Sequence, residues 1–154
     1  MGKQISPDEI EKVVAQNRRA RHQFEILETF EAGLVLCGTE VKTLRSGKVS
    51  IEEAYGRIDG DAAYLVGAYI DEYVFGNRMN HSPTRKRKLL LRKPELKRLH
   101  AKVTQKGLTL VPLKLYFRGG WAKLEIALCR GKRLGDKREV SRRREADREM
   151  GRYR

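Results

Sequence analysis

The C-terminal segment, Arg130 to Arg154, is too highly charged to form part of a packed core. It holds eleven lysines and arginines against five aspartates and glutamates, with only five apolar side chains. Such a composition buries too little apolar surface to offset the entropy lost on ordering. Its opposite charges alternate at helical spacing, so a polyanion that neutralises the basic excess can induce a helix. We therefore predict that residues 131–154 form a basic tail, disordered when free, that folds on nucleic acid.

The rest of the chain is basic as well. The 154 residues include 34 basic and 20 acidic side chains, a net charge of +14. The tail contributes 11 − 5 = +6, so residues 1–129 retain +14 − 6 = +8. A field of this sign concentrates near polyphosphates and gives a salt-dependent affinity. We interpret the charge as a nucleic-acid surface; a solvated basic surface without a specific partner is the alternative.

Other classes of protein are disfavoured by composition. The chain has no run of about 18 apolar residues and no apolar signal-peptide region, which indicates a cytoplasmic protein. Cys37 and Cys129 lie in apolar runs without CxxC spacing, and we predict buried free thiols. The three histidines are isolated, so we predict neither a metal site nor a cofactor.

The first half of the chain predicts two helices and two strands. A capping box with a proline after it indicates a short helix from about Pro7 to Gln16. Residues 24–28 and 34–37 have strand composition, and Glu31-Ala32-Gly33 is predicted to form the turn between them. A further helix is expected to enter at Gly38 and to end near Gly47.

The second half predicts two hairpins and a helix. Asp59-Gly60 is a hairpin turn signal between strands 54–58 and 62–66. Strands 108–117 and 121–128 flank a second turn that contains two glycines. Between the hairpins, Pro94 opens and Gly107 closes a helix whose inner face is predicted to hold Leu96, Leu99, His100 and Val103.

Together these elements predict a mainly β fold with helices. About six antiparallel strands linked mainly by hairpins favour a barrel of the oligonucleotide-binding (OB) sort, with about three flanking helices. We expect an N-terminal arm over residues 1–16, an RNA-binding β-barrel domain over 17–130, and the basic tail over 131–154.

Several motifs occur in an order that is typical of one family. They are Asn17–His22, Phe30–Gly33, Gly38–Lys42, Leu44–Lys48, Pro83–Leu91, Gly107–Leu113, Ala127–Leu128, Gly131–Lys132 and Asp136–Arg138. From about Val13 to Glu139 the chain resembles SmpB, the small protein that partners transfer-messenger RNA (tmRNA) in bacterial ribosome rescue. The residues outside that range fit only in character.

The resemblance implies an RNA-binding adaptor and not an enzyme. SmpB binds the transfer-RNA-like domain of tmRNA, stands in for its missing anticodon arm, and enters stalled ribosomes with it. Its C-terminal tail occupies the decoding centre of the small subunit and the empty messenger path, against ribosomal RNA. Elongation factor Tu and alanyl-tRNA synthetase are further partners that the resemblance implies, through the RNA.

The resemblance and the local chemistry together give the candidate site residues. Cationic and hydrogen-bonding side chains in the loop that begins at Asn17 suit RNA phosphates and splayed bases. A phosphate would repel the carboxylate of Glu31, which suits base N–H groups instead. Asp136, Lys137 and Arg138 are the candidate ribosome contacts of the tail. The candidate RNA-binding residues are Asn17, Arg18, Arg19, Arg21, His22, Glu31, Lys42, Arg45, Leu90, Lys123, Gly131, Lys132 and Arg133.

Composition alone leaves other interpretations open at several of these positions. Leu90 has the character of a core residue, and Glu31 that of a solvated turn residue. Lys42, Arg45 and Lys123 fit ordinary solvated surfaces equally well. Gly135 occupies a position where many SmpB proteins carry a histidine, an aromatic or a basic residue, so a stacking contact is not expected there.

Two other functions compete with the adaptor. A generic basic ribosomal or translation-associated protein of OB fold would bind many RNAs alike. A nuclease would need an acid–base pair or a metal site, and the sequence offers only His22 near Glu25 or Glu28 for this purpose.

Overall fold

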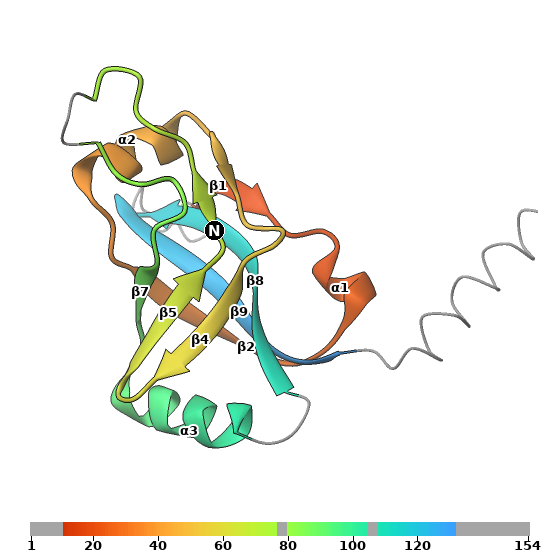
Figure 1. The fold of residues 1–154 in the computed structure, drawn as a ribbon. Helices are drawn as coiled ribbons and strands as arrows, with labels where there is room; N and C mark the ends of the chain where they lie inside the picture. The colour runs from red at the N-terminus through yellow and green to blue at the C-terminus, as the bar shows by residue number, and fades with distance from the viewer. Residues whose placement is uncertain (1–10, 77–79, 105–107, 132–154) are drawn as a thin grey trace, which may run out of the picture.

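The computed structural model describes residues 11–76, 80–104 and 108–131, and within them the fold is mainly β with three helices (Figure 1). The elements are β1 (Glu11–Gln16), α1 (Ala20–Gln23), β2 (Phe24–Leu34), α2 (Gly38–Arg45), β3 (Val49–Ser50), β4 (Tyr55–Asp59), β5 (Ala62–Val66), β6 (Tyr69–Ile70), β7 (Arg87–Leu90), α3 (Lys93–Val103), β8 (Leu108–Arg118) and β9 (Trp121–Gly131).

Six of the strands pair into a ring. Their order is β8-β4-β5-β7-β2-β9, every pairing is antiparallel, and β9 pairs back with β8. Strand β1 adds to the free side of β8, and β3 pairs with β6 in a separate two-stranded sheet. Figure 1 shows α2 and α3 at opposite ends of the ring.

The core lies inside the ring because alternate residues of each strand point inward. Along β9 the inward residues are Leu124, Ile126 and Leu128, all fully buried, as the sequence predicts. From α3, Leu99 is fully buried in the same cluster. A second, smaller cluster of buried apolar residues joins α1 to β2, β8 and β9; it consists of Ala20, Val111, Leu113, Ala127 and Cys129.

Both predicted hairpins are confirmed. Strands β4 and β5 pair from Tyr55–Val66 to Asp59–Ala62 around Gly60, whose φ of 61° is the left-handed value that the turn requires. Strands β8 and β9 pair up to Arg118 and Trp121, across two glycines of positive φ. The helix that enters at Gly38 is confirmed as α2.

The predicted N-terminal helix is wrong for the residues that the structure describes. Residues 11–16 form β1, whose register runs from Glu11 opposite Arg118 to Gln16 opposite Lys114. The edge of β8 offers hydrogen-bond partners to the backbone of residues 11–16 when it is extended. The β-branched side chains of Val13 and Val14 also favour a strand. Tertiary pairing therefore overrides the local capping signal.

The predicted turn at residues 31–33 is also wrong. Strand β2 continues through it, and Glu31, Ala32 and Gly33 pair with residues of β9. Strand β9 pairs with all three residues and β7 pairs with Gly33, and composition alone does not reveal this long-range pairing. Gly33 is needed for close packing instead, because a Cβ there would lie 3.2 Å from the Cβ of Leu90.

Two side-chain environments also differ from expectation. Cys129 is buried as predicted, but Cys37 is exposed at the N-terminal end of α2. His100, predicted to face the core from α3, is exposed. None of the described helices has the length and apolar character needed to cross a bilayer.

Candidate nucleic-acid interface

Three of the candidate residues meet on the outer face of the ring. The register places Glu31 of β2 opposite Glu125 of β9, and Gly33 opposite Lys123 on one side and Leu90 of β7 on the other. Ala32 and Leu124, between these positions along the strands, are fully buried, so their neighbours face outward. Glu31, Leu90 and Lys123 accordingly line one depression of about 500 Å³, which residues 91, 92 and 95 complete.

Leu90 is an exposed apolar residue, not a core residue. Its exposed fraction is 55 %, whereas the preceding Leu89 is buried. The alternation of β7 assigns Leu89 to the core and Leu90 to the surface. The interpretation of Leu90 as a core residue from composition is therefore wrong, and its side chain is available to a partner.

The Glu31 carboxylate is held by two donors from β8. The Tyr116 hydroxyl donates a hydrogen bond to Oε2 at 2.5 Å. Arg118 Nη1 lies 3.0 Å from Oε1 and 2.8 Å from Oε2. The Glu31 side chain nevertheless remains 39 % exposed, so it can still accept a hydrogen bond from outside.

Tyr116 is almost completely covered, although it lies on the outer face. Its exposed fraction is 3 %, and its ring is flanked by Lys114 Nζ at 4.8 Å and the Arg118 guanidinium at 5.5 Å from the centroid. Burial, together with the hydrogen bond to Glu31, raises the pKa of the Tyr116 hydroxyl well above its usual value. Tyr116 is therefore a protonated donor throughout the physiological pH range.

Strand β1 connects to this group of charges through Glu11. Arg118 Nη2 donates to Glu11 Oε1 at 2.6 Å, and Lys114 Nζ donates to Glu11 Oε2 at 3.0 Å. These two hydrogen bonds lower the pKa of Glu11. Lys114 Nζ also lies 3.6 Å from Glu125. The carboxylates on this face are thus matched by nearby cations, which reduces their repulsion of a phosphate backbone.

The basic loop after β1 forms a second depression on the other side of Glu125. It measures about 360 Å³ and is lined by Gln16, Asn17, Arg18, Arg21, Leu113, Lys114 and Glu125. Arg18 and Arg21 are both exposed. Because Glu125 is opposite Glu31 and two residues from Lys123, the two depressions adjoin across β9.

Asn17 anchors this loop to the sheet. Its backbone N–H donates to Leu113 O at 2.7 Å and its Nδ2 donates to Pro112 O at 3.0 Å. The side chain is buried, and its Oδ1 has no hydrogen-bond partner within the described part of the chain. The structure therefore gives Asn17 a role in positioning Arg18 and Arg21.

The remaining candidates lie outside both depressions. Arg19 is exposed with Glu52 at 3.9 Å, and His22 is exposed on α1. Lys42 and Arg45 are exposed on α2, with Lys42 Nζ 5.3 Å from the centroid of the Tyr73 ring. Gly131 is exposed at the end of β9. Lys132, Arg133, Asp136, Lys137 and Arg138 lie outside the described residues, as does most of the predicted tail.

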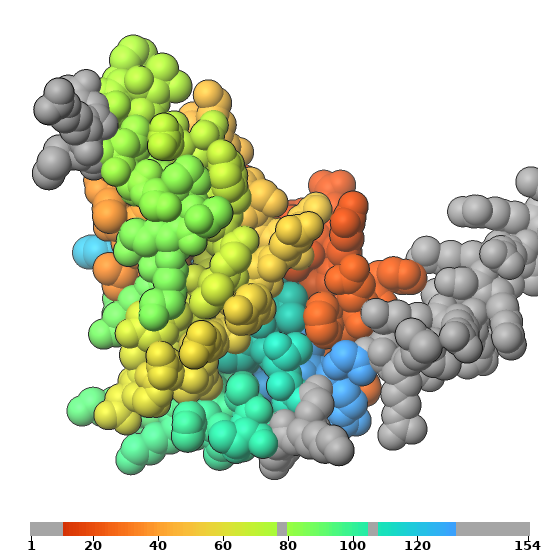
Figure 2. Space-filling model, in the orientation of Figure 1, coloured from red at the N-terminus to blue at the C-terminus, as the bar shows by residue number. Residues whose placement is uncertain are grey.

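Strands β4 and β5 form the face of the ring that Figure 2 shows. In the space-filling view the side chains of β4, β5 and the segment before β7 fill the surface, and β2 and β9 are largely hidden behind them (Figure 2). This agrees with the ring order, in which β5 is three pairings away from β9.

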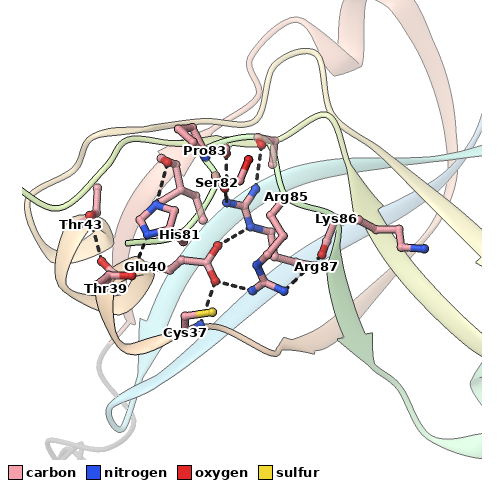
Figure 3. A network of polar contacts seen from close by, with 12 residues as sticks. Cys37, Thr39, Glu40, Thr43, His81, Ser82, Pro83, Arg85, Lys86 and Arg87 are labelled. Carbon is pink, nitrogen blue, oxygen red and sulfur yellow. Dashed lines mark hydrogen bonds and ion pairs between the residues drawn. The ribbon is translucent and has the colours of Figure 1, made fainter. Parts of the chain in front are cut away.

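A buried ion cluster fixes α2 against the segment that leads into β7 (Figure 3). Glu40 of α2 accepts a hydrogen bond from Arg87 Nε at 2.6 Å, one from the Cys37 backbone N–H at 2.8 Å, and one from Arg85. The side chains of Glu40 and Arg87 are fully buried. Arg87 Nη1 also donates to Ala68 O at 2.8 Å. The cluster therefore holds the strand that presents Leu90.

The Glu40 cluster gives the fold a specific dependence on pH. Burial alone would raise the pKa of Glu40, but the hydrogen bonds from Arg85, the Cys37 N–H and Arg87 outweigh it and lower the pKa from 4.5 to about 2. Because the folded pKa lies below the unfolded value, this stabilisation is present above about pH 4.5 and is lost as the pH falls toward 2. The shift corresponds to about 3 kcal/mol.

We expect urea unfolding to show this loss as a lower free energy of unfolding at pH 3 than at pH 5. Glu40→Gln removes the titrating group and should reduce the slope over that range. An equal slope in wild type and variant would contradict the assignment to Glu40.

The described residues contain no group of three or more histidine, cysteine, aspartate or glutamate side chains placed to hold a metal ion. What the two depressions offer together is three carboxylates, those of Glu31, Glu95 and Glu125, together with an apolar contact and several cations. Sequence reasoning missed Tyr116, Arg118, Lys114 and Glu11; the only signal for the first three is their i, i+2 spacing on one strand face.

Comparisons with known proteins agree with this chemistry. The family model described as "SmpB protein" matches residues 14–154. The SsrA-binding protein of Agrobacterium fabrum is 52% identical over 144 residues, which cover 93% of this chain and 90% of the relative. That of Sinorhizobium fredii is 50% identical over 153 residues, which cover 99% and 96%.

A solved structure is similar as well. It is described as "tmRNA-SmpB: a journey to the center of the bacterial ribosome". The match has a TM-score of 0.68 and 54% sequence identity, and covers 84% of this chain and 94% of the other.

Proposed function

Because the chain belongs to the SmpB protein family, we propose that it binds the transfer-RNA-like domain of tmRNA and delivers it to stalled ribosomes for trans-translation. Relatives that match over most of their length are SsrA-binding proteins, and the similar structure concerns tmRNA-SmpB and the bacterial ribosome. In this role the protein is an RNA-binding adaptor of the bacterial cytoplasm that makes and breaks no covalent bond.

Membership of the SmpB family also supports proposals about the barrel, the tail and further partners. The six-stranded ring is an OB-like barrel, and residues 17–130 are the RNA-binding domain. Residues 131–154 enter the decoding centre and the empty messenger path, with Asp136, Lys137 and Arg138 against ribosomal RNA. Elongation factor Tu and alanyl-tRNA synthetase meet the complex through the RNA.

The observation that carries the proposal is the depression shared by Glu31, Leu90 and Lys123. A carboxylate accepts hydrogen bonds from base N–H groups, an exposed leucine packs on an unstacked base or sugar, and a lysine pairs with a phosphate group. The neighbouring depression adds Arg18 and Arg21 for the backbone. A surface that bound phosphate alone would have no use for Glu31 at its centre.

Glu31→Ala tests this proposal in a competition titration at fixed salt. We expect the variant to lose about tenfold or more of the wild-type preference for the transfer-RNA-like domain over bulk transfer RNA, since a good base contact is worth about 1–3 kcal/mol. Glu53→Ala is the matched control, because it removes the same charge from an exposed position outside both depressions. It should keep the preference.

The generic basic RNA-binding protein makes the opposite prediction. Equal binding of all RNAs, unaffected by Glu31→Ala and lost steeply with salt, would favour that alternative and overturn the adaptor proposal.

A further inference from the structure

We propose that Tyr116, Arg118 and Glu11 are positioning residues that hold the Glu31 carboxylate in one orientation and thereby set the selectivity of the protein for its RNA. The inference rests on the proposed function and adds that the selectivity depends on β8 and on the edge strand β1.

Contacts with β8 constrain the side chain of Glu31. An exposed glutamate ordinarily samples several rotamers, and ordering it on binding costs conformational entropy. Here the Tyr116 hydroxyl binds Oε2 at 2.5 Å and Arg118 binds both oxygens, at 3.0 and 2.8 Å. Tyr116 is too deeply buried to turn away. The carboxylate is therefore oriented before any RNA arrives, which reduces the entropy lost on binding.

The Glu31 carboxylate keeps part of its hydrogen-bonding capacity for a partner. An ionised carboxylate has about four lone-pair sites and no donor. Tyr116 and Arg118 occupy part of this capacity from the β8 side, and the exposed part of Glu31 faces the depression with Leu90 and Lys123. The Glu31 carboxylate can then accept hydrogen bonds from base N–H groups on that side only. It repels base edges that present acceptors.

Glu11 connects β1 to the site through Arg118. Arg118 is long and partly exposed, but its second nitrogen binds Glu11 at 2.6 Å, and Lys114 binds the other oxygen of Glu11 at 3.0 Å. The two terminal guanidinium nitrogens of Arg118 are thus used, one on each carboxylate. Without Glu11, Arg118 would be free to leave Glu31, and the orientation would depend on Tyr116 alone.

A purely structural role for these contacts is the competing explanation, because Tyr116 also lies between Val13 of β1 and Lys123 of β9 in the sheet. The two explanations differ in one respect. A structural role affects stability and all RNA binding alike, whereas a positioning role changes selectivity only while Glu31 carries its carboxylate.

A double-mutant cycle separates these explanations. Tyr116→Phe and Glu11→Gln are each made in wild type and in Glu31→Gln. The quantity measured is the ratio of the Kd for bulk transfer RNA to the Kd for the transfer-RNA-like domain of tmRNA. We expect Tyr116→Phe to lower this ratio about fivefold and Glu11→Gln about threefold in wild type, as for the loss of one hydrogen bond. In the Glu31→Gln background neither should change it by as much as twofold.

Tyr64→Phe is the matched control, since it deletes the same hydroxyl from a tyrosine on β5, away from both depressions. Thermal unfolding checks that each variant is folded. Equal reductions in both backgrounds, or an unchanged ratio in Tyr116→Phe when Glu31→Gln alone reduces it, would overturn the inference. A wild type with no preference for the tmRNA domain would instead overturn the proposed function, and the inference with it.

Discussion

Replacing Glu40 with alanine is expected to lower the free energy of unfolding by about 3–5 kcal/mol, the usual cost of removing one partner of a buried ion pair. The loss has two physical sources. Arg87 would remain fully buried with its Nε unpaired, and the Cys37 backbone N–H would lose its acceptor. A desolvated guanidinium without a counter-charge is costly, and Arg87 cannot neutralise itself by releasing a proton.

Chemical denaturation at pH 7 measures this effect directly. Glu52→Ala is the control, because its carboxylate is exposed and lies 3.9 Å from Arg19, and such surface pairs contribute about 0–1 kcal/mol. The double variant Glu40→Ala, Arg87→Met should recover part of the loss, since it removes the unpaired charge. A decrease below about 1 kcal/mol in Glu40→Ala would contradict the account of the cluster.

The strands and hairpins of this fold could be predicted from the sequence where a local pattern, such as alternation or a glycine turn, marks them. The alternation of Leu124, Ile126 and Leu128 assigns β9 its inner face, and the glycine turns mark both hairpins. Long-range pairing could not be predicted in this way. Residues 11–16 carry a helix-capping signal before them, yet their structure is decided by the free edge of β8, about a hundred residues away.

The same limit applies to the orientation of charged and apolar side chains on β7. The run from Arg85 to Lys88 has the composition of a solvated basic segment, but alternation on β7 turns Arg87 inward, where Glu40 of α2 meets it. Leu90 has the composition of a core residue and is exposed for the same reason. Period-2 alternation fixes these orientations only once the strand boundaries are known.

The candidate site shows how a resemblance and a structure complement each other. The resemblance selected Glu31, Leu90 and Lys123 from widely separated parts of the sequence, and the register brings them to one depression. Their contacts with RNA remain predictions. The residues that orient Glu31 come from β8 and β1, and no local pattern joins positions 11, 31 and 118.

Gly56 lies in the shortest strand pairing of the ring, and we expect Gly56→Ala to lower the free energy of unfolding by about 1–3 kcal/mol. Strands β4 and β8 share one register pair, Gly56 with Leu110. A Cβ at Gly56 would lie 2.7 Å from the Leu110 Cβ and 2.9 Å from Ile126 Cδ1, inside the packed core. Neither neighbour can move far, because both are fully buried.

The added methyl group must therefore push β4 away from β8 at the one pair that joins them. Amide hydrogen exchange should then increase in both strands more than in β2 and β9, whose pairing is extensive. Gly38→Ala provides the matched control, since a Cβ at Gly38 meets no atom within 4 Å and alanine favours the helix that starts there. If Gly56→Ala were as well tolerated as Gly38→Ala, β4 would have room to shift, and closure of the ring would not depend on this glycine.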